Sequence, residues 1–164
     1  MYTILALRWL HVIGSAVLLG TGIGIAFFML MAHRTRDAAL IAHTASVVVI
    51  ADYVFTATAV VIQPITGALL IKYVGWEWSQ GWILASIGLY VFVGMLWLPV
   101  IWMQSRMRNL ARSAAVAASP LPRKYFKLFR LWFAFGIPAF LAVLLIIWLM
   151  LAKPLLTAVE SHLQ

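Results

Sequence analysis

The sequence predicts an all-α polytopic membrane protein, a bundle of four transmembrane helices in one domain that spans residues 1–164. The chain is 65% hydrophobic and only 10% charged, with a mean hydropathy of +1.04. A soluble domain carries roughly 25% charged residues. In addition, several apolar stretches exceed the ~20 residues that a helix needs to cross a membrane. The expected solvent of this chain is therefore the lipid bilayer.

Four apolar segments account for most of the chain. Backbone groups in hydrocarbon must form hydrogen bonds within their own segment, so each segment is expected to be helical. A helix rises about 1.5 Å per residue, and each segment is long enough to cross about 30 Å of hydrocarbon. The segments cover residues 4–31, 45–71, 82–104 and 129–152, and the longest connection is a predicted basic loop over residues 105–128.

The distribution of basic residues predicts the orientation. Positively charged connections are retained in the cytoplasm. Nine of the twelve Lys and Arg residues lie in or beside the first and third connections, which places both termini on the outer face of the inner membrane. These nine are Arg34, Arg36, Arg106, Arg108, Arg112, Arg123, Lys124, Lys127 and Arg130.

Several functional classes are excluded or disfavoured. The net charge of +8 lies in loops rather than on a soluble module, so we expect no nucleic-acid partner. The chain has no cysteine, which excludes disulfides and thiolate metal sites. It contains no H-E-x-x-H motif, P-loop or nucleophile elbow, so hydrolase and nucleotide chemistry are not expected. The sequence identifies neither a catalytic residue nor a metal site.

The second segment has a polar face. Asp52, Thr56, Ala59, Gln63 and Thr66 follow one another at helical spacing and fall on one side of a helix. Polar side chains are costly in hydrocarbon, so this face should point into the bundle. The third segment has a weaker polar face, which comprises Ser86, Tyr90, Trp97 and Gln104.

Alternating helix directions bring several polar residues to the outer half of the bundle. A convergent polar cluster in an apolar surrounding is typical of a ligand or cofactor pocket. Hydrogen bonds that only hold the helices together, each worth about 0.6 kcal/mol, explain the cluster equally well. Its members are His11, Ser15, Gln63, Thr66, Ser86 and Tyr90.

Asp52 lies in the inner half. A proton-relay or substrate-binding role competes with a structural ion pair to an arginine of the first or third connection. Pro64 should kink its helix and free backbone carbonyls near the outer cluster. Gly20 and Gly24 are spaced for close helix packing, which explains them without any chemistry.

The sequence resembles a known family along most of its length. The segments that carry the resemblance read LRWLHVIG at residues 7–14, GTGIGIAFF at 20–28, MAHR at 31–34, IADYVFT at 50–56 and QPITG at 63–67. They are similar to the bacterial domain-of-unknown-function family two-two-six-nine. This resemblance implies a bacterial inner-membrane protein of four helices and no established activity.

A more distant resemblance is to HemJ-type protoporphyrinogen oxidases and the copper-resistance protein D group. Their first helix also opens with an aromatic-x-x-His pattern, which implies that His11 is a haem b ligand or lies beside the porphyrin. The third segment lacks the lysine and histidine that those proteins carry. Met150 reaches a similar depth, although methionine is ordinarily apolar filler. His33 and His43 flank the first connection, where interfacial histidines are commoner than ligands to a metal or a haem edge.

Three functions remain open. The first is a redox-linked protein that binds haem b, with Ser15, Gln63 and Tyr90 beside His11. The second is a non-catalytic accessory or assembly subunit, which would act as a homo-oligomer or within a larger membrane complex. The third is a small proton-coupled transporter, which would use the polar face from Asp52 through Thr56 to Thr66. The sequence does not decide whether the protein is an enzyme.

Overall fold

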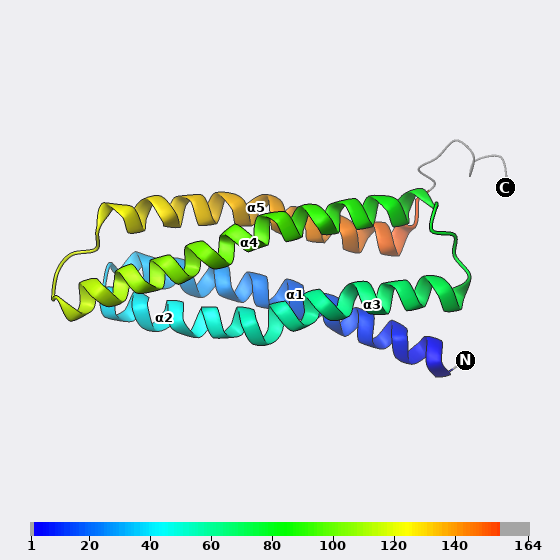
Figure 1. Ribbon diagram of the computed structural model, residues 1–164, viewed down its shortest axis with the longest axis horizontal. Helices are drawn as coiled ribbons and strands as arrows, with labels where there is room; N and C mark the ends of the chain where they lie inside the picture. Colours follow the sequence, from blue (N-terminus) through cyan, green and yellow to red (C-terminus); the bar gives the residue numbers. More distant parts are fainter. Residues whose placement is uncertain (1, 155–164) are drawn as a thin grey trace.

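The chain forms a bundle of long helices that run alternately in opposite directions (Figure 1). The computed structural model describes residues 2–154. The second span is one continuous helix, Ala38–Val74, in which a single π-helical turn separates two α-helical parts. The elements are α1 (Tyr2–Thr35), α2 (Ala38–Ala51), the π turn η1 (Asp52–Thr56), α3 (Ala57–Val74), α4 (Gly81–Val116) and α5 (Arg123–Ala152).

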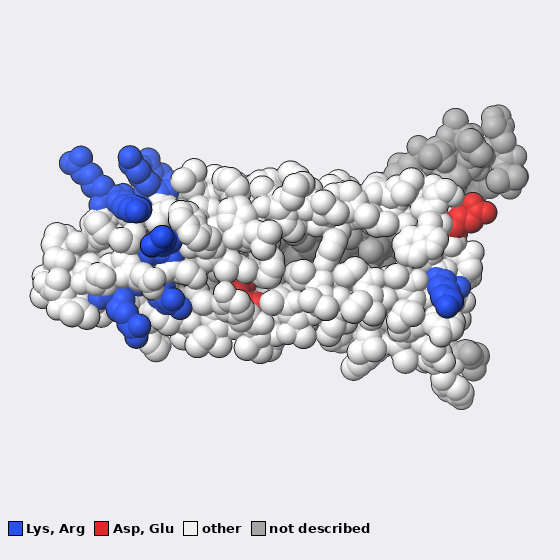
Figure 2. All heavy atoms as spheres, in the orientation of Figure 1, with Lys and Arg blue, Asp and Glu red and all other residues white. Residues whose placement is uncertain are grey.

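The two ends of the bundle differ in charge. We call the end with the α1–α2 and α4–α5 connections the basic end, because Lys and Arg gather there (Figure 2). The opposite end, where α1 begins and α5 ends, is the terminal end (Figure 1).

Four helices in the described part of the chain are long and apolar enough to cross a membrane. Their outward faces carry large apolar side chains, such as Val12, Phe55 and Leu98, that are more than half exposed. Such a surface is unfavourable in water and suits lipid. The predicted all-α fold of four membrane helices is therefore confirmed.

The helices extend beyond the hydrophobic segments. α4 continues to Val116 and α5 begins at Arg123, so that only residues 117–122 connect them. The prediction of a loop over residues 105–128 is therefore wrong. Hydropathy marks where a helix lies in hydrocarbon, whereas arginine, alanine and methionine continue a helix well into polar surroundings.

Single capping residues determine where α2 begins and where α3 ends. The Asp37 carboxylate caps α2, accepting hydrogen bonds from the backbone N–H groups of Ala39 at 2.7 Å and Leu40 at 3.0 Å. Gly75 ends α3 with φ +84°, a left-handed conformation that glycine adopts without steric cost.

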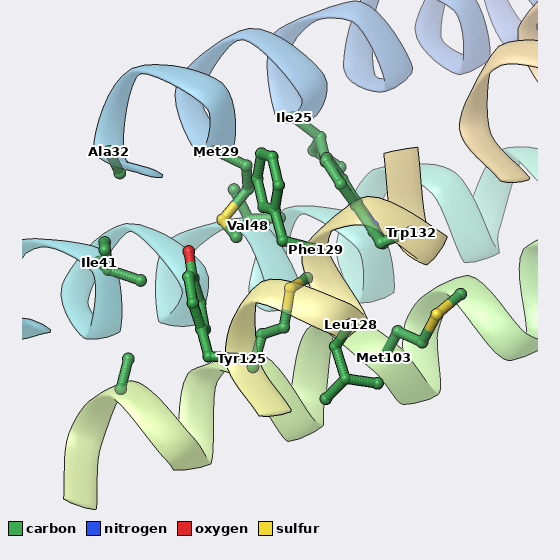
Figure 3. Close-up of a cluster of buried hydrophobic side chains, with 13 residues drawn as sticks. Ile25, Met29, Ala32, Ile41, Val48, Met103, Tyr125, Leu128, Phe129 and Trp132 are labelled. Atoms are coloured by element: carbon green, nitrogen blue, oxygen red, sulfur yellow. The ribbon is translucent and has the colours of Figure 1, made fainter. Parts of the chain in front are cut away.

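A large apolar core lies at the basic end (Figure 3). Side chains of α1, α2, α4 and α5 fill it, and several of them have no exposed surface. Its buried members are Ile25, Met29, Ala32, Ile41, Ala45, Val48, Met103, Met107, Ala111, Tyr125, Leu128, Phe129 and Trp132.

His33 belongs to this end of the bundle. Its ring stacks on Phe129 with the centroids 3.7 Å apart and the planes 5° from parallel. Its Nδ1 lies 3.3 Å from the hydroxyl of Tyr125. These contacts fasten the end of α1 to the beginning of α5, and they explain His33 without a metal or haem.

A smaller apolar cluster closes the terminal end. It joins Ile71 of α3, Trp82 and Ile83 of α4, and Leu149 of α5. The Lys153 ammonium lies 4.3 Å above the centre of the Trp76 ring, a cation–π contact at the edge of this cluster.

The bundle is less tightly packed between the two clusters. α4 packs mainly on α5, and α3 packs mainly on α1, so the terminal half consists of two helix pairs. Figure 2 shows a hollow between these pairs on the face in view. The polar side chains of the bundle lie at this depth.

Three of the four glycines of α1 do not bring helices of this chain together. A Cβ atom on Gly20, Gly22 or Gly24 would meet no atom within 4 Å. The expectation that Gly20 and Gly24 mediate close helix packing therefore fails within the chain. α1 makes its close approach elsewhere, at Gly14, where a Cβ would lie 3.1 Å from the side-chain nitrogen of Gln63.

We predict that the basic-end core provides much of the stability. Met107 is fully buried, whereas Met95 on the same helix is 61% exposed to the surroundings. Met107→Ala should lower the free energy of unfolding by about 2–5 kcal/mol, because it leaves a cavity. The control Met95→Ala should change it by less than about 0.5 kcal/mol. Denaturant unfolding in detergent micelles measures both, and equal losses would contradict this assignment of the core.

Candidate functional site

Four of the residues that the sequence selects meet between α1 and α3. The Gln63 amide nitrogen donates to the Ser15 hydroxyl at 2.7 Å and to the His11 carbonyl at 3.0 Å. The Nδ1 atom of His11 lies 2.8 Å from the Thr66 hydroxyl oxygen. Gln63 and Thr66 are buried, and His11 and Ser15 are half-buried.

Small residues allow the two helices to approach each other here. Gly14 faces Gln63, and Gly67 faces the His11 ring, where a Cβ would lie only 3.3 Å from Cε1. Sequence reasoning did not single out Gly14 and Gly67. Their position three or four residues from His11 and Gln63 was a signal, since residues at this spacing share one face of a helix.

The Thr66 hydroxyl is the partner of Nδ1 of His11. Its oxygen also lies 2.9 Å from the backbone carbonyl of Ile62 and 3.1 Å from that of Gln63. When the hydroxyl donates to one of these carbonyls, it accepts a hydrogen bond from Nδ1–H of His11, and Nε2 then carries a free lone pair. When it donates to Nδ1 instead, the ring proton is on Nε2.

The other ring nitrogen of His11 faces the sulfur of a methionine. Nε2 of His11 lies 3.4 Å from Sδ of Met150 on α5. A thioether sulfur is a weak acceptor, so a protonated Nε2 donates a hydrogen bond to it, whereas an unprotonated Nε2 leaves two electron-pair donors facing each other. Imidazole and thioether groups are both ligands of soft metal centres.

Tyr90 lies outside this cluster and has another role. Its hydroxyl donates a hydrogen bond to the backbone carbonyl of Val60. Val60 precedes Pro64 by four residues, so the missing N–H of the proline leaves that carbonyl without its helical donor. Tyr90 thus joins α4 to α3 at the carbonyl that Pro64 frees. Ser86, which the sequence also assigned to the cluster, donates instead to the carbonyl of Trp82 in its own helix.

Asp52 and Thr56 form a second, separate polar region. They are the first and last residues of the π turn and are both buried. The polar side chains that adjoin the Asp52 carboxyl are those of Thr56, Gln104 and Trp97. None of these is charged, so the expected ion pair with an arginine is not formed.

The other histidine that flanks the first connection, His43, lies on α2 and is exposed. In the described residues, no three His, Asp or Glu side chains come together in a group that could hold a metal ion. His162, in the C-terminal tail, falls outside the described residues.

A double-mutant cycle tests the link between Tyr90 and Pro64. Tyr90→Phe should lower the free energy of unfolding by about 1–3 kcal/mol, because it leaves the half-buried Val60 carbonyl without a donor. In a Pro64→Ala background the alanine N–H supplies the helical bond, and Tyr90→Phe should then cost much less. Denaturant unfolding in micelles measures the coupling energy, and additive effects would argue against this link.

Comparison with known proteins identifies a family. No curated protein and no solved structure gives a match to the chain. The more distant resemblance to HemJ and copper-resistance protein D therefore gains no support. The family model DUF2269, described as a predicted integral membrane protein, matches residues 5–154. This match covers nearly the whole chain, and the protein therefore belongs to the DUF2269 family of integral membrane proteins.

Proposed function

We propose that this protein binds haem b within the bacterial inner membrane and takes part in electron transfer. His11 and Met150 are the residues that would hold the haem. The observation that carries the proposal is the contact of 3.4 Å between Nε2 of His11 and Sδ of Met150. Histidine and methionine together are an established pair of haem ligands.

The two donor atoms lie near enough to hold one metal centre between them. Their separation of 3.4 Å is shorter than two metal–ligand bonds of about 2 Å or more placed end to end. Methionine has three rotatable side-chain bonds, so the Met150 side chain would move aside to hold the group.

The surroundings also suit a large planar ligand. α1 contacts α5 only sparsely, although His11 and Met150 lie on these two helices. Leu18 lies two helical turns from His11 on α1, and Ile146 lies one turn from Met150 on α5. Both are half-exposed apolar side chains, of the kind that lines a cofactor site.

The residues around His11 prepare it for ligation. The Thr66 hydroxyl contacts Nδ1 and so holds the orientation of the ring; a ligand on Nε2 would place the ring proton on Nδ1, where the Thr66 oxygen accepts it. Gln63 binds the backbone carbonyl of His11 and so fixes the position of its Cα. When bound, the haem supplies one-electron chemistry.

We predict a haem spectrum that depends on His11. Protein purified in detergent from haem-replete cells should show a Soret band. His11→Ala should abolish it, because the first ligand is lost, whereas the control His43→Ala, at an exposed position, should retain it. Met150→Leu should convert a six-coordinate low-spin spectrum into a five-coordinate high-spin spectrum. Its matched control is Met95→Leu, which faces the surroundings.

Two outcomes would overturn the haem assignment. A colourless preparation would do so, and so would an unchanged Soret band in His11→Ala. Metal analysis of the same samples distinguishes a bare metal ion from haem. Copper in the wild type that is lost in both His11→Ala and Met150→Leu, without a Soret band, would identify a bare metal ion in place of the haem.

We further propose that the basic end of the bundle faces the cytoplasm and that the terminal end faces the periplasm. The proposal rests on the concentration of Lys and Arg at the basic end (Figure 2) and on the retention of such charge on the cytoplasmic side. It accounts for the cation–π contact of Lys153 with Trp76 as an anchor at the outer interface.

Single cysteines test this orientation cleanly, since the natural chain contains none. Ser79→Cys lies in the α3–α4 turn, and Ala118→Cys lies in the α4–α5 connection; both positions are exposed. A maleimide that does not cross membranes should label Ser79→Cys in cells with a permeable outer membrane. It should label Ala118→Cys only after the inner membrane is also opened. The reverse pattern would refute the orientation.

A further inference from the structure

Four buried polar atoms without hydrogen-bond partners gather around the π turn. They are Oδ2 of Asp52, Oγ1 of Thr56, Nε1 of Trp97 and Oε1 of Gln104. The last three belong to side chains that lie close enough to the Asp52 carboxyl to interact with it, although none makes a hydrogen bond of normal geometry. An unsatisfied buried polar atom costs about 1–3 kcal/mol, so the four atoms together provide partners for a small bound molecule.

The chemistry of these atoms defines the occupant. Asp52 and Gln104 present acceptor oxygens, Thr56 presents a hydroxyl, and Trp97 presents an N–H donor. The N–H dipole of Trp97 repels a bare cation. A water molecule accepts the Trp97 hydrogen bond and donates to Gln104 and Asp52, which gives it the three partners that a buried water typically has.

The charge of Asp52 has no compensation from any helix packed against the π turn. On α1 no charged residue lies between Arg8 and His33, and on α2 the nearest titratable residue is His43. On α4 the nearest is Arg106, which is exposed and stacks near Trp102. A buried carboxyl with only neutral polar neighbours is stable in the protonated form.

The π turn lies at the same position in the second span as the unpartnered polar atoms around Asp52. The backbone N–H of Ala57 donates to the Asp52 carbonyl, five residues away, instead of to the residue four before it. A π turn is less favourable than regular α-helix and is frequent at functional sites. Its coincidence with the unpartnered atoms supports a binding role for this turn.

The route from Asp52 to water leads toward the terminal end. Toward the basic end, the apolar core closes the bundle with Val48, Met103 and Trp132. Toward the terminal end, the next inward-facing polar group is Gln63, whose Oε1 atom is buried and also lacks a partner. Eleven residues separate Asp52 from Gln63, which is about 16 Å along the helix.

We propose that Asp52 is a proton-binding site of the membrane domain, which holds a proton and a bound water with Trp97 and Gln104. The proton exchanges with the terminal side of the bundle along the polar face that leads through Thr56 to Gln63. The proposal does not rest on haem binding at His11, because every atom that carries it lies in the π turn, α3 or α4.

Infrared spectroscopy of the full-length protein in detergent tests the protonated carboxyl directly. The chain has only four Asp and Glu residues, so its carboxyl bands can be assigned individually. At neutral pH we expect a C=O stretching band of a protonated carboxyl that Asp52→Asn removes. The matched control Glu77→Gln, at an exposed position, should keep the band. A wild-type spectrum without the band, or a band that survives Asp52→Asn, overturns the proposal.

Two further variants test the bound water without relying on the aspartate substitution. Trp97→Phe removes the donor, and Gln104→Leu removes one acceptor, and both retain most of the side-chain volume. Each should shift the frequency of the Asp52 band, because each changes the hydrogen bonds of the water that binds it. An unchanged frequency in both variants, in protein that elutes as the wild type does in size exclusion, rules out the shared water.

Hydrogen–deuterium exchange tests the route. The Asp52 band should shift soon after transfer to D₂O, since the path is polar. Gln63→Leu should slow this shift several-fold, whereas Thr58→Val, an exposed position on the same helix, should not. A band that shifts only on unfolding refutes exchange in the native state, and an unchanged rate in Gln63→Leu refutes the route toward the terminal end.

Discussion

The absence of water from the bilayer interior is the constraint on which the rest of this structure depends. Every polar group between the membrane surfaces must find its partner inside the bundle. The Val60 carbonyl shows how this shapes the fold. Pro64 removes its helical donor, and the hydroxyl of Tyr90 on α4 replaces it. The same constraint turns Gln63 toward α1, where it binds Ser15 and the His11 carbonyl.

Hydropathy and helical spacing predict much of this molecule. The four-helix membrane fold and the family are confirmed, and the inward polar face of the second span brings Gln63 and Thr66 to His11. Other features depend on tertiary contacts that no local pattern encodes. The π turn at Asp52 and the close approach of Gly67 to His11 are two of these. The roles of the polar residues stay predictions.

Two histidines on α1 show why residue type alone does not identify a site. His33 stacks on Phe129 and contacts the hydroxyl of Tyr125, so its ring is fully engaged in packing. His11 has one nitrogen held by Thr66 and the other directed at a sulfur atom. The difference comes from α5, whose contacting residues Tyr125 and Met150 lie 92 and 139 residues away from these two histidines in the sequence. It can be read only once the helices are placed side by side.

The separation of the apolar core from the polar residues divides the molecule by depth. The basic-end core contains neither His11 nor Asp52, and the polar side chains contribute little apolar burial. Natural amino-acid substitutions are therefore subject to different constraints at different depths in the membrane. Changes near the basic end are expected to act on whether the chain folds, whereas changes nearer the terminal end fall on the polar residues of the proposed binding sites. Within a family of such proteins, the polar residues nearer the terminal end can diverge while the apolar core at the basic end remains constant.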